Sequence, residues 1–204
     1  MRKLSWMGLL AFVLAFAMPA MAQNSYSPLQ GYAGYGLLHA TCCGGSVNAN
    51  GGVGEVEFNA SNLLGIVGEF AGYTTSQDMA TLNIYTYQGG PRIYLSRGKI
   101  EPWFQFLIGG AHLSGSASVS EEDTVVGVTG FGVVHPQATS GGLGSVSGSA
   151  NGFNMDIGGG VDVNVAQHFA IRPVELSYEY SHFSAGSGVS FNSLRYSAGF
   201  VIKF

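Results

Sequence analysis

The sequence predicts an all-β fold, an eight-stranded antiparallel up-and-down transmembrane β-barrel. Residues 193–204 alternate between bulky apolar side chains and polar or small ones, which is the period of a strand. Glycine accounts for 32 of 204 residues, and charged residues make up 10% of the chain, against about 25% in ordinary soluble domains. Alternating segments recur along the chain, separated in turn by short and long polar connections. This pattern is typical of barrels that face lipid on the outside.

The first 22 residues have the features of a secretory signal peptide. Arg2 and Lys3 give a positive start, residues 4–17 form an apolar core, and residues 20–22 (Ala-Met-Ala) form a small-residue cleavage site. We expect Gln23 to begin the mature protein, residues 23–28 to be a short lead and residues 29–204 to be the barrel domain. After residue 22, no run approaches the ~18 apolar residues of a transmembrane helix. An exported chain with lipid-facing strands is expected in a bacterial outer membrane.

The charge balance argues against nucleic acid as a partner. Without Arg2 and Lys3, six Lys/Arg oppose twelve Asp/Glu, which gives a net charge of about −6. No basic stripe is present that could bind phosphates. The length fits one domain, and no linker divides it.

Eight segments are predicted as strands: 29–40, 51–59, 64–73, 81–96, 102–114, 152–165, 169–182 and 193–204. Most reach the ~9–11 residues that a tilted strand needs to cross a bilayer. Tight turns are predicted at 59–63, 97–101 and 166–168, and longer connections rich in Gly, Ser, Thr and Asn at 41–50, 74–80, 115–151 and 183–192. Short periplasmic turns that alternate with long external loops place both termini on the periplasmic side.

Alternation assigns the inward face of most strands. On the second and third strands, Glu55, Glu57 and Glu69 share the side opposite the apolar residues. On the fourth strand, residues 89–91 (Gly-Gly-Pro) interrupt the pattern because proline cannot donate to a ladder, and Arg92 is placed inside. The same reasoning places acidic residues of the sixth and seventh strands inside, and the first strand remains unassigned.

The inward positions are predicted to form a charge network, because an unpaired charge in a narrow lumen loses solvation that it cannot recover. Arg92 is expected near Glu55 and Glu69, and Arg195 near Glu179 across the last hairpin. The surplus of acids requires some of them to be solvated or protonated. The predicted network consists of Glu55, Glu57, Glu69, Arg92, Asp156, Asp162, Glu175, Glu179 and Arg195.

Aromatic residues beside the short turns and at the C-terminus predict a girdle at one membrane surface. The residues are Phe58, Trp103, Phe104, Phe169 and Phe204. Aromatic side chains of outer-membrane barrels gather at the two interfaces with water.

The end of the chain resembles the C-terminal assembly signal of outer-membrane barrels, with Ser197, Gly199, Ile202 and Phe204 at its polar, glycine, hydrophobic and aromatic positions. The stretches 87–92, 101–103 and 108–111 resemble small OmpA/OmpX-like and opacity-type, porin-like barrels, and the resemblance covers most of 29–204. It implies outer-membrane lipid and lipopolysaccharide as the surroundings. It also implies the barrel assembly machinery and periplasmic chaperones as partners during biogenesis, and we expect a monomer.

Cys42 and Cys43 are the two cysteines of the chain. Adjacent Cα atoms lie ~3.8 Å apart, below the usual ~4.4–6.8 Å of a disulfide, so a bridge between them would be strained. Neither lies at the signal cleavage site, which excludes a lipoprotein anchor. An incidental loop pair is favoured, and a redox or interchain role is the alternative.

His182 and Ser184 resemble the His-x-Ser pair of outer-membrane lipid A deacylases, in which the imidazole takes a proton from the serine. That family supplies its orienting acid after the pair, whereas no Asp or Glu follows Glu179 here. The remaining histidines show no metal-ligand spacing, and no cofactor or metal is expected.

These observations favour a non-enzymatic barrel with a role in envelope integrity or in surface interaction through its long external loops. Eight strands leave a lumen that side chains just fill, which disfavours a wide pore. The alternatives are a narrow small-solute channel and a lipid A deacylase-like enzyme that uses His182 and Ser184.

Overall fold

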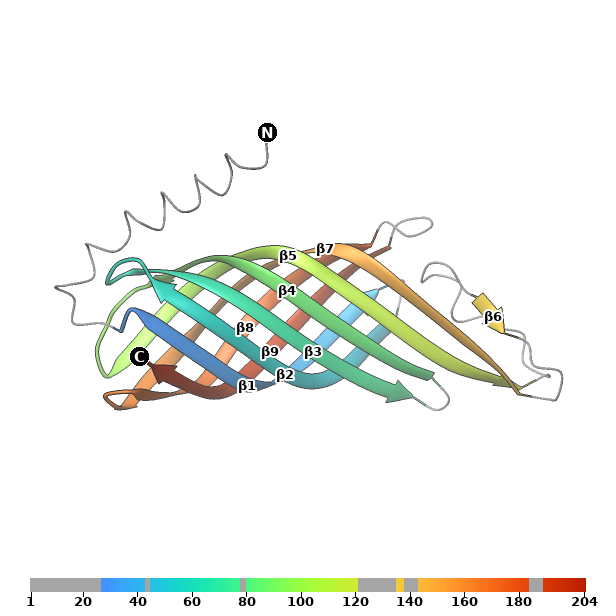
Figure 1. Ribbon diagram of the computed structural model, residues 1–204, viewed down its shortest axis with the longest axis horizontal. Coiled ribbons are helices and arrows are strands. Elements are labelled where there is room, and N and C mark those ends of the chain that lie inside the picture. The colour runs from blue at the N-terminus through green and yellow to red at the C-terminus, as the bar shows by residue number, and fades with distance from the viewer. Residues whose placement is uncertain (1–26, 43–44, 78–79, 121–134, 138–142, 184–188) are drawn as a thin grey trace, which may run out of the picture.

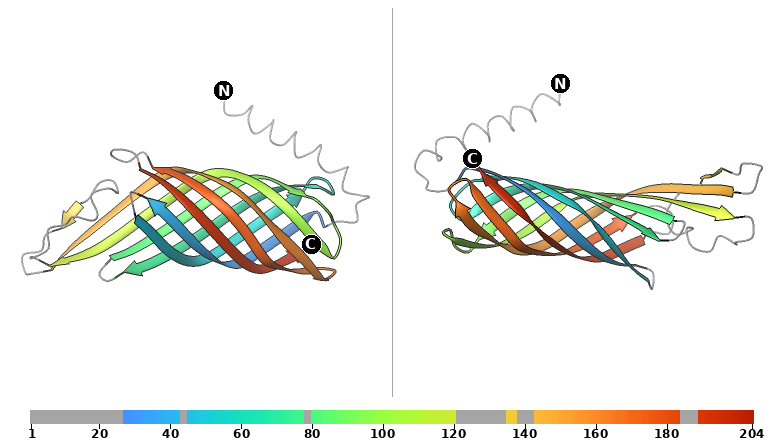
Figure 2. Two further views of the ribbon diagram at one scale, coloured as in Figure 1. Left: turned by 180° about the vertical axis from the view of Figure 1, so that it is seen from behind. Right: turned by 90° about the horizontal axis from the view of Figure 1, so that it is seen from below.

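The computed structural model describes residues 27–42, 45–77, 80–120, 135–137, 143–183 and 189–204. Within these ranges the chain forms one sheet that closes into an eight-stranded antiparallel barrel, so the predicted fold class is confirmed (Figures 1 and 2). The strands are β1 (Leu29–Cys42), β2 (Gly45–Asn59), β3 (Leu64–Gln77), β4 (Ala80–Tyr94), β5 (Ile100–Ser120), β6 (His135–Gln137), β7 (Leu143–Ala166), β8 (Phe169–Phe183) and β9 (Val189–Lys203).

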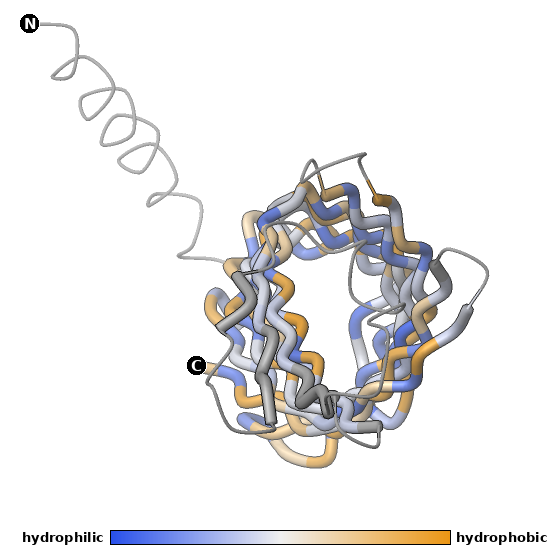
Figure 3. Tube along the Cα trace, turned by 90° about the vertical axis from the view of Figure 1, so that its right-hand side faces the viewer, coloured by the Kyte–Doolittle hydropathy of each residue, from blue (hydrophilic) through white to orange (hydrophobic). Residues whose placement is uncertain are grey.

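The strand order is β5-β4-β3-β2-β1-β9-β8-β7-β6, and the pairing of β5 with β7 closes the ring. The short strand β6 pairs with β7 alone and stays outside the closed barrel. Viewed along its axis, the chain trace forms a closed circuit (Figure 3). No helix in the part of the chain that the structure describes is long and apolar enough to cross a membrane.

The two ends of the barrel differ. At one end, which we call the terminal end, the start of β1 lies beside the last residue of the chain: Phe204 N donates to Leu29 O at 2.9 Å. At the opposite end, which we call the ribbon end, β5 and β7 remain paired up to Ser120 and Leu143, whereas β4 stops opposite Ala117. The two strands therefore project as a ribbon beyond the other strands (Figure 1).

The strands are longer at the ribbon end than the sequence predicted. β2 begins at Gly45 instead of residue 51, and β7 begins at Leu143 instead of residue 152. β5 continues to Ser120, and β9 begins at Val189. The predicted long connections 41–50, 74–80, 115–151 and 183–192 are therefore wrong over most of their described residues, which belong to strands.

The polarity of the barrel wall reverses toward the ribbon end. Over most of the wall, outward side chains are apolar, such as Val56 and Phe200, which are 61% and 56% exposed. Near the ribbon end, the outward residues become polar, such as His39 and Asn48, and the inward residues become apolar. Each barrel strand contributes one buried residue to what we call the apolar ring: Leu38, Ala49, Tyr73, Ile84, Leu113, Ala150, Phe183 and Phe191.

A polar outside around an apolar inside is the arrangement of a barrel in water, whereas lipid requires the opposite. The reversal therefore marks the level at which the wall leaves the apolar layer. It also explains the longer strands, because the predicted loop segments keep the alternation of period 2 with a polar outward face.

Candidate functional site

All nine side chains of the sequence-predicted network point into the lumen of the barrel, and each is 4% exposed or less. Because β-strands alternate strictly, the apolar outward residues fix the direction of their polar neighbours. The burial of so many charges makes the lumen the candidate functional site, and its geometry decides whether it conducts, binds or closes.

The first cluster surrounds Arg92 of β4. Arg92 Nη1 donates to Glu57 Oε2 and Nη2 donates to Glu55 Oε2, both at 2.8 Å. The ring of Trp103 lies under the guanidinium, 3.8 Å from its central carbon to the ring centroid. Arg92 is therefore in contact with its predicted neighbour Glu55. Its other predicted neighbour, Glu69, is hydrogen-bonded to Gln88 and Arg195 instead.

Arg172 of β8 is the central cation of the lumen. The alternation of the sequence did not place it there. Alternation from Leu176 would place Arg172 toward lipid, yet it is 1% exposed and inward. A register shift between Arg172 and Glu175 changes the face of the strand, and Pro173 lies within it. A bulge adds one residue to a strand, and proline favours such sites because it cannot donate to the ladder. The sequence signal that could have indicated this bulge is the proline that directly follows Arg172.

Three carboxylates bind Arg172. Its Nε donates to Asp162 at 2.7 Å, and its Nη1 donates to Glu55 at 2.8 Å and to Glu175 at 2.9 Å. Glu55 Oε2 therefore joins Arg172 to Arg92, since both guanidinium groups donate to that one oxygen.

The next cluster surrounds Arg195 of β9. Arg195 Nη2 donates to Glu69 Oε2 at 2.7 Å and to Glu175 Oε1 at 3.0 Å, and Arg195 Nη1 also donates to Glu69. Glu179 Oε1 lies 2.9 Å from Nη1, and Asp156 Oδ2 lies 3.5 Å from Nη2. The main partner is thus Glu69 on the opposite wall, together with the predicted hairpin neighbour Glu179.

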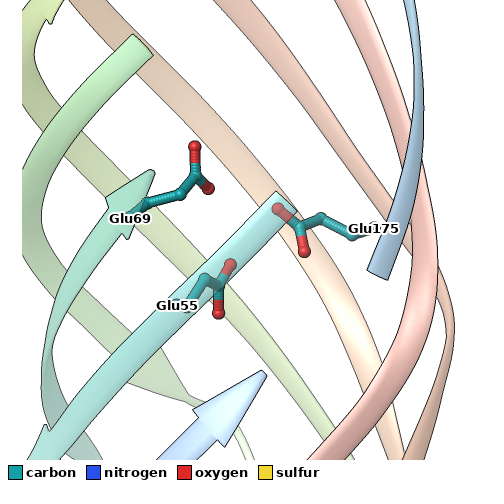
Figure 4. Close-up of side chains that lie close together, drawn as sticks. All are labelled: Glu55, Glu69 and Glu175. Carbon is teal, nitrogen blue, oxygen red and sulfur yellow. The ribbon is translucent and has the colours of Figure 1, made fainter. Parts of the chain in front are cut away.

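Glu55, Glu69 and Glu175 each bring one carboxylate oxygen within 4.8 Å of the others (Figure 4). Each of the three carboxylates already accepts hydrogen bonds from an arginine. Three guanidinium groups therefore supply the positive charge that a metal ion would otherwise supply. We interpret the cluster as an ion-pair network that runs continuously between β2, β3, β4, β8 and β9.

Trp103 corrects the predicted aromatic girdle. It is 1% exposed and lies in the lumen, where the guanidinium carbon of Arg172 is 4.5 Å from its ring. Trp103 shares the inward side of β5 with the buried Glu101 and Gln105, while Phe104 between them is 59% exposed. Position beside a short turn therefore did not distinguish the two faces, although the alternation of β5 does.

Neutral polar groups extend the network toward the ribbon end. Gln88 donates to Glu69 at 2.8 Å, Asn154 donates to Gln88 at 3.0 Å, and Ser181 donates to Asn154 at 2.6 Å. The apolar ring lies next to them on the side of the ribbon end. The side-chain rings of Phe183 and Phe191 meet there edge to face, with 5.6 Å between their centroids. The cavity between these layers has a volume of about 10 Å³, which is the space of roughly one water molecule.

A separate cluster lies at the terminal end. Glu101 accepts from Lys203 Nζ and from Asn164 Nδ2, both at 2.8 Å, and from Arg97 Nη1 at 3.3 Å. These contacts join β5, β7 and β9 next to the last residue of the chain. The predicted network did not include Glu101, because no face had been assigned to the fifth strand.

His182 of the predicted His-x-Ser pair hydrogen-bonds to a different serine. His182 Nδ1 lies 3.0 Å from Ser190 Oγ across the β8–β9 hairpin, and Tyr180 Oη lies 3.1 Å from the same Oγ. Ser184 lies outside the described residues. His182 and Ser190 face outward, and Tyr180 Oη contacts the serine and not the imidazole. Among the described contacts, no carboxylate is bonded to His182, as the acid of a hydrolase triad would be.

Cys42 ends β1, but its side chain and Cys43 lie outside the described residues, as do residues 1–26 with the predicted signal peptide. In the predicted assembly signal, Ser197 is buried and lies 3.0 Å from Tyr32 Oη. A Cβ at Gly199 would lie 2.2 Å from Ala33 O, so packing alone requires glycine there. Ile202 and Phe204 face outward. Recognition of these residues by an assembly factor remains a prediction.

A closed eight-stranded barrel with an apolar outer wall and an ionic lumen has the features of an outer-membrane protein. A family described as "Outer membrane protein beta-barrel domain" matches residues 8–204. The chain belongs to this outer-membrane β-barrel family. The barrel therefore lies in a bacterial outer membrane, and in such barrels short turns face the periplasm and long connections face outside. Because the hairpins extend farther beyond the apolar wall at the ribbon end, we assign the terminal end to the periplasm and the ribbon end to the exterior.

Solved structures agree with this fold. Ail, the attachment invasion locus protein of Yersinia pestis, is 18% identical, with 87% of this chain and 99% of Ail covered and a TM-score of 0.57. Neisserial surface protein A (NspA) is 13% identical, with 89% and 100% covered and a TM-score of 0.59. These identities establish a common fold and not a common partner. A search of curated proteins found no match.

Proposed function

We propose that this protein is a non-enzymatic barrel that contributes to envelope integrity and to contacts outside the cell through its ribbon-end hairpins. The β5–β7 ribbon, which projects beyond a filled lumen, is the observation that carries this proposal. A projecting pair of strands provides area for contact, whereas the buried ion pairs of the described residues lie across the path that a solute would take through the lumen.

The filled lumen argues against the narrow-channel alternative. Three arginines and seven acids occupy the middle of the barrel in direct contact, and the apolar ring follows toward the exterior. Water and ions would have to separate buried ion pairs and then pass an apolar constriction, and each step costs several kcal/mol, on the order of the penalty for breaking a buried pair.

The charge distribution favours neutral partners over polyanions. Ail has been crystallised with sucrose octasulfate, a heparin analogue. In this chain, no Lys or Arg occurs between residues 100 and 171, the segment that holds the ribbon. Serine pairs face outward on β5 and β7 next to the base of the ribbon, with Ser114 opposite Ser149 and Ser116 opposite Ser147. We therefore expect hydrogen bonding to neutral groups and no binding of polyanions by this segment.

Removal of the ribbon tests the proposal. Residues 117–146 are deleted and Ser116 is joined through Asn-Gly to its register partner Ser147, since Asn-Gly suits a two-residue hairpin. The matched control replaces residues 78 and 79, between β3 and β4, by Asn-Gly. We expect the deletion to reduce adhesion of expressing cells to cultured epithelial cells and to each other, while vancomycin resistance stays normal. A strain lacking the whole protein that keeps both adhesion and resistance would contradict the proposal.

The contact between His182 and Ser190 keeps the enzymatic alternative testable. If His182 cleaved an acyl ester with Ser184, as the sequence suggested, or with Ser190, expression of the protein would lower the mass of lipid A, and Ser184→Ala or Ser190→Ala would restore it. We expect no mass change in either case, because no carboxylate is bonded to the described pair.

A further inference from the structure

The outer wall over β8, β9, β1 and β2 contains a groove of about 610 Å³. Its outward lining consists of two rows that cross these four strands side by side. In register, the periplasmic row is Leu176, Tyr196, Leu37 and Asn50, and the external row is Tyr178, Leu194, His39 and Asn48.

The groove lies where the wall changes from apolar to polar. Leu37, Leu176 and Leu194 are 50–61% exposed and form its apolar part. Hydrogen-bonding side chains line the other part: His39 Nδ1 lies 2.6 Å from Asn48 Oδ1, and Asn50 lies beside them. The two tyrosines are held against the wall, since Tyr178 Oη donates to Asn192 at 2.7 Å and Tyr196 Oη donates to Pro173 O at 2.9 Å.

The occupant of such a groove is set by its surroundings. On a barrel in a membrane, a groove at the apolar–polar boundary is filled by lipid, with the acyl chain against the leucines and the headgroup against the polar side chains. The outward polar groups of the groove are the side chains of His39, Asn48 and Asn50, and neither row contains Lys or Arg. Arg195 also borders the groove, but it is buried on the lumen side and bonded to Glu69. A phosphate would call for cationic partners, whereas sugar hydroxyls and amides match neutral ones.

We propose that this groove binds an acylated amino-sugar lipid of the outer leaflet. One acyl chain lies along Leu37 and Leu194, and the hydroxyls or amide of the sugar bond to His39, Asn48 and Asn50. His39 and Asn48 bond to each other through one atom each, which leaves the imidazole Nε2 and the amide Nδ2 for the sugar. The proposal rests on the barrel lying in the outer membrane and not on its adhesive role.

The barrel provides a matched control for the experiment. His112 of β5 and Asn151 of β7 form the same cross-strand pair on another part of the wall, with His112 Nδ1 2.7 Å from Asn151 Oδ1. The groove variant is His39→Leu with Asn48→Leu, and the control variant is His112→Leu with Asn151→Leu. A third variant, Leu194→Trp, fills the apolar part and keeps every polar group.

Native mass spectrometry of the purified full-length barrel in micelles measures bound lipid, with three probes added at equal concentration. The probes are diphosphoryl lipid A, the same lipid A after dephosphorylation, and phosphatidylethanolamine. We expect one molecule of either lipid A form to bind to the parent and to the control variant. The variant His39→Leu with Asn48→Leu should bind it roughly 10- to 30-fold more weakly, the effect of losing about two neutral hydrogen bonds. Leu194→Trp should also bind it more weakly, because the indole ring fills the space of the acyl chain. Binding should not change between about 0.05 and 0.5 M salt.

Three outcomes would overturn the proposal. Equal binding by the groove and control variants would show that the groove is not the site. Loss of binding on dephosphorylation would show that phosphate is recognised. Equal retention of phosphatidylethanolamine would show that the sugar is not recognised. All three leave the adhesion experiment unaffected, so the failure of one proposal is distinguishable from the failure of the other. Normal heat-modifiable migration of each variant in electrophoresis establishes that it is folded.

Discussion

Replacing Arg195 by methionine removes the only guanidinium that contacts Glu69, Glu179 and Asp156 among the described residues. Methionine fills a similar volume, so the loss is mainly electrostatic. Glu175 keeps Arg172 at 2.9 Å, whereas Glu69 loses both hydrogen bonds to the cation and keeps that from Gln88. Breaking a buried pair by removing one partner costs about 3–5 kcal/mol, and we expect a loss of about 4 kcal/mol in the free energy of unfolding.

A second substitution identifies the carboxylate that is left without its partner. Arg195→Met with Glu69→Gln should recover about 2 kcal/mol, because the charge that lost two hydrogen bonds is then neutral. Arg195→Met with Glu179→Gln should recover less, since Glu179 has a single close contact with Arg195. The comparison separates the contact with the opposite wall from the hairpin contact that the sequence had suggested.

Urea titration of the barrel in lipid vesicles measures these differences. Trp103 is the only tryptophan after residue 22, and it lies 3.8 Å from Arg92, so its fluorescence reports on the network itself. Lys99→Met is the control, because Lys99 is exposed and an exposed charge contributes within about 0.5 kcal/mol. If the free energy of unfolding of Arg195→Met lies within about 1 kcal/mol of the parent, well below the range of about 3–5 kcal/mol for buried pairs, the network does not stabilise the barrel.

Four further outcomes are expected. Arg172→Met should destabilise the barrel by about 3–5 kcal/mol in the same titration, because Asp162, Glu55 and Glu175 all bind it; a loss similar to that of Lys99→Met would contradict the central place of Arg172. The parent barrel should carry no steady current in planar bilayers, and Phe183→Ala with Phe191→Ala should carry none either, since the ion pairs remain; a current through the parent would show that the lumen is open. Deletion of Phe204 should lower the amount of folded protein in the membrane while the mature chain still begins at Gln23, as N-terminal sequencing can show; normal amounts would remove Phe204 from the assembly signal. Protease added to intact cells should cut within residues 121–142 and leave the strands intact, and protection of that segment would argue against its exposure outside.

The inward face of the barrel was predictable because alternation has few exceptions in a lipid-facing wall. Glu55, Glu57 and Glu69 lie opposite Val56, Phe58 and Phe70, and a shift of one residue would place the glutamates in lipid. Because charged side chains that face lipid destabilise a barrel, the apolar and acidic residues of these strands can be assigned to one face only. The pairing of each charge was less predictable, because partners such as Arg195 and Glu69 are 126 residues apart in the chain and meet only after the barrel closes.

Arg172 and Trp103 were missed for two different physical reasons. A bulge at Pro173 changed the face of β8, and alternation counted from Leu176 cannot detect an added residue. Trp103 was assigned by its distance from a turn, which gives depth in the membrane but not direction. Both residues belong to the same contact, since Arg172 and Arg92 lie over the Trp103 ring. The centre of the lumen was therefore the part that sequence reasoning described least well.

The dimensions of β9 connect the reversal of polarity with the membrane. Its outward residues are apolar or small from Leu194 to Phe204, and polar at Asn192 and Ser190. Ten residue steps at ~3.3 Å span ~33 Å along the strand, and a tilt of ~40° reduces this to ~25 Å, the usual height of the apolar band. Leu194 therefore lies at the external edge of the band, and the alternation continues past it unchanged. Beyond Leu194 the surroundings of the wall change from lipid to water. The inward Phe191 and Val189 therefore pack as the core of a barrel in water. The β8–β9 hairpin then depends on the apolar ring for its stability outside the membrane, as the buried ion pairs lie below that level.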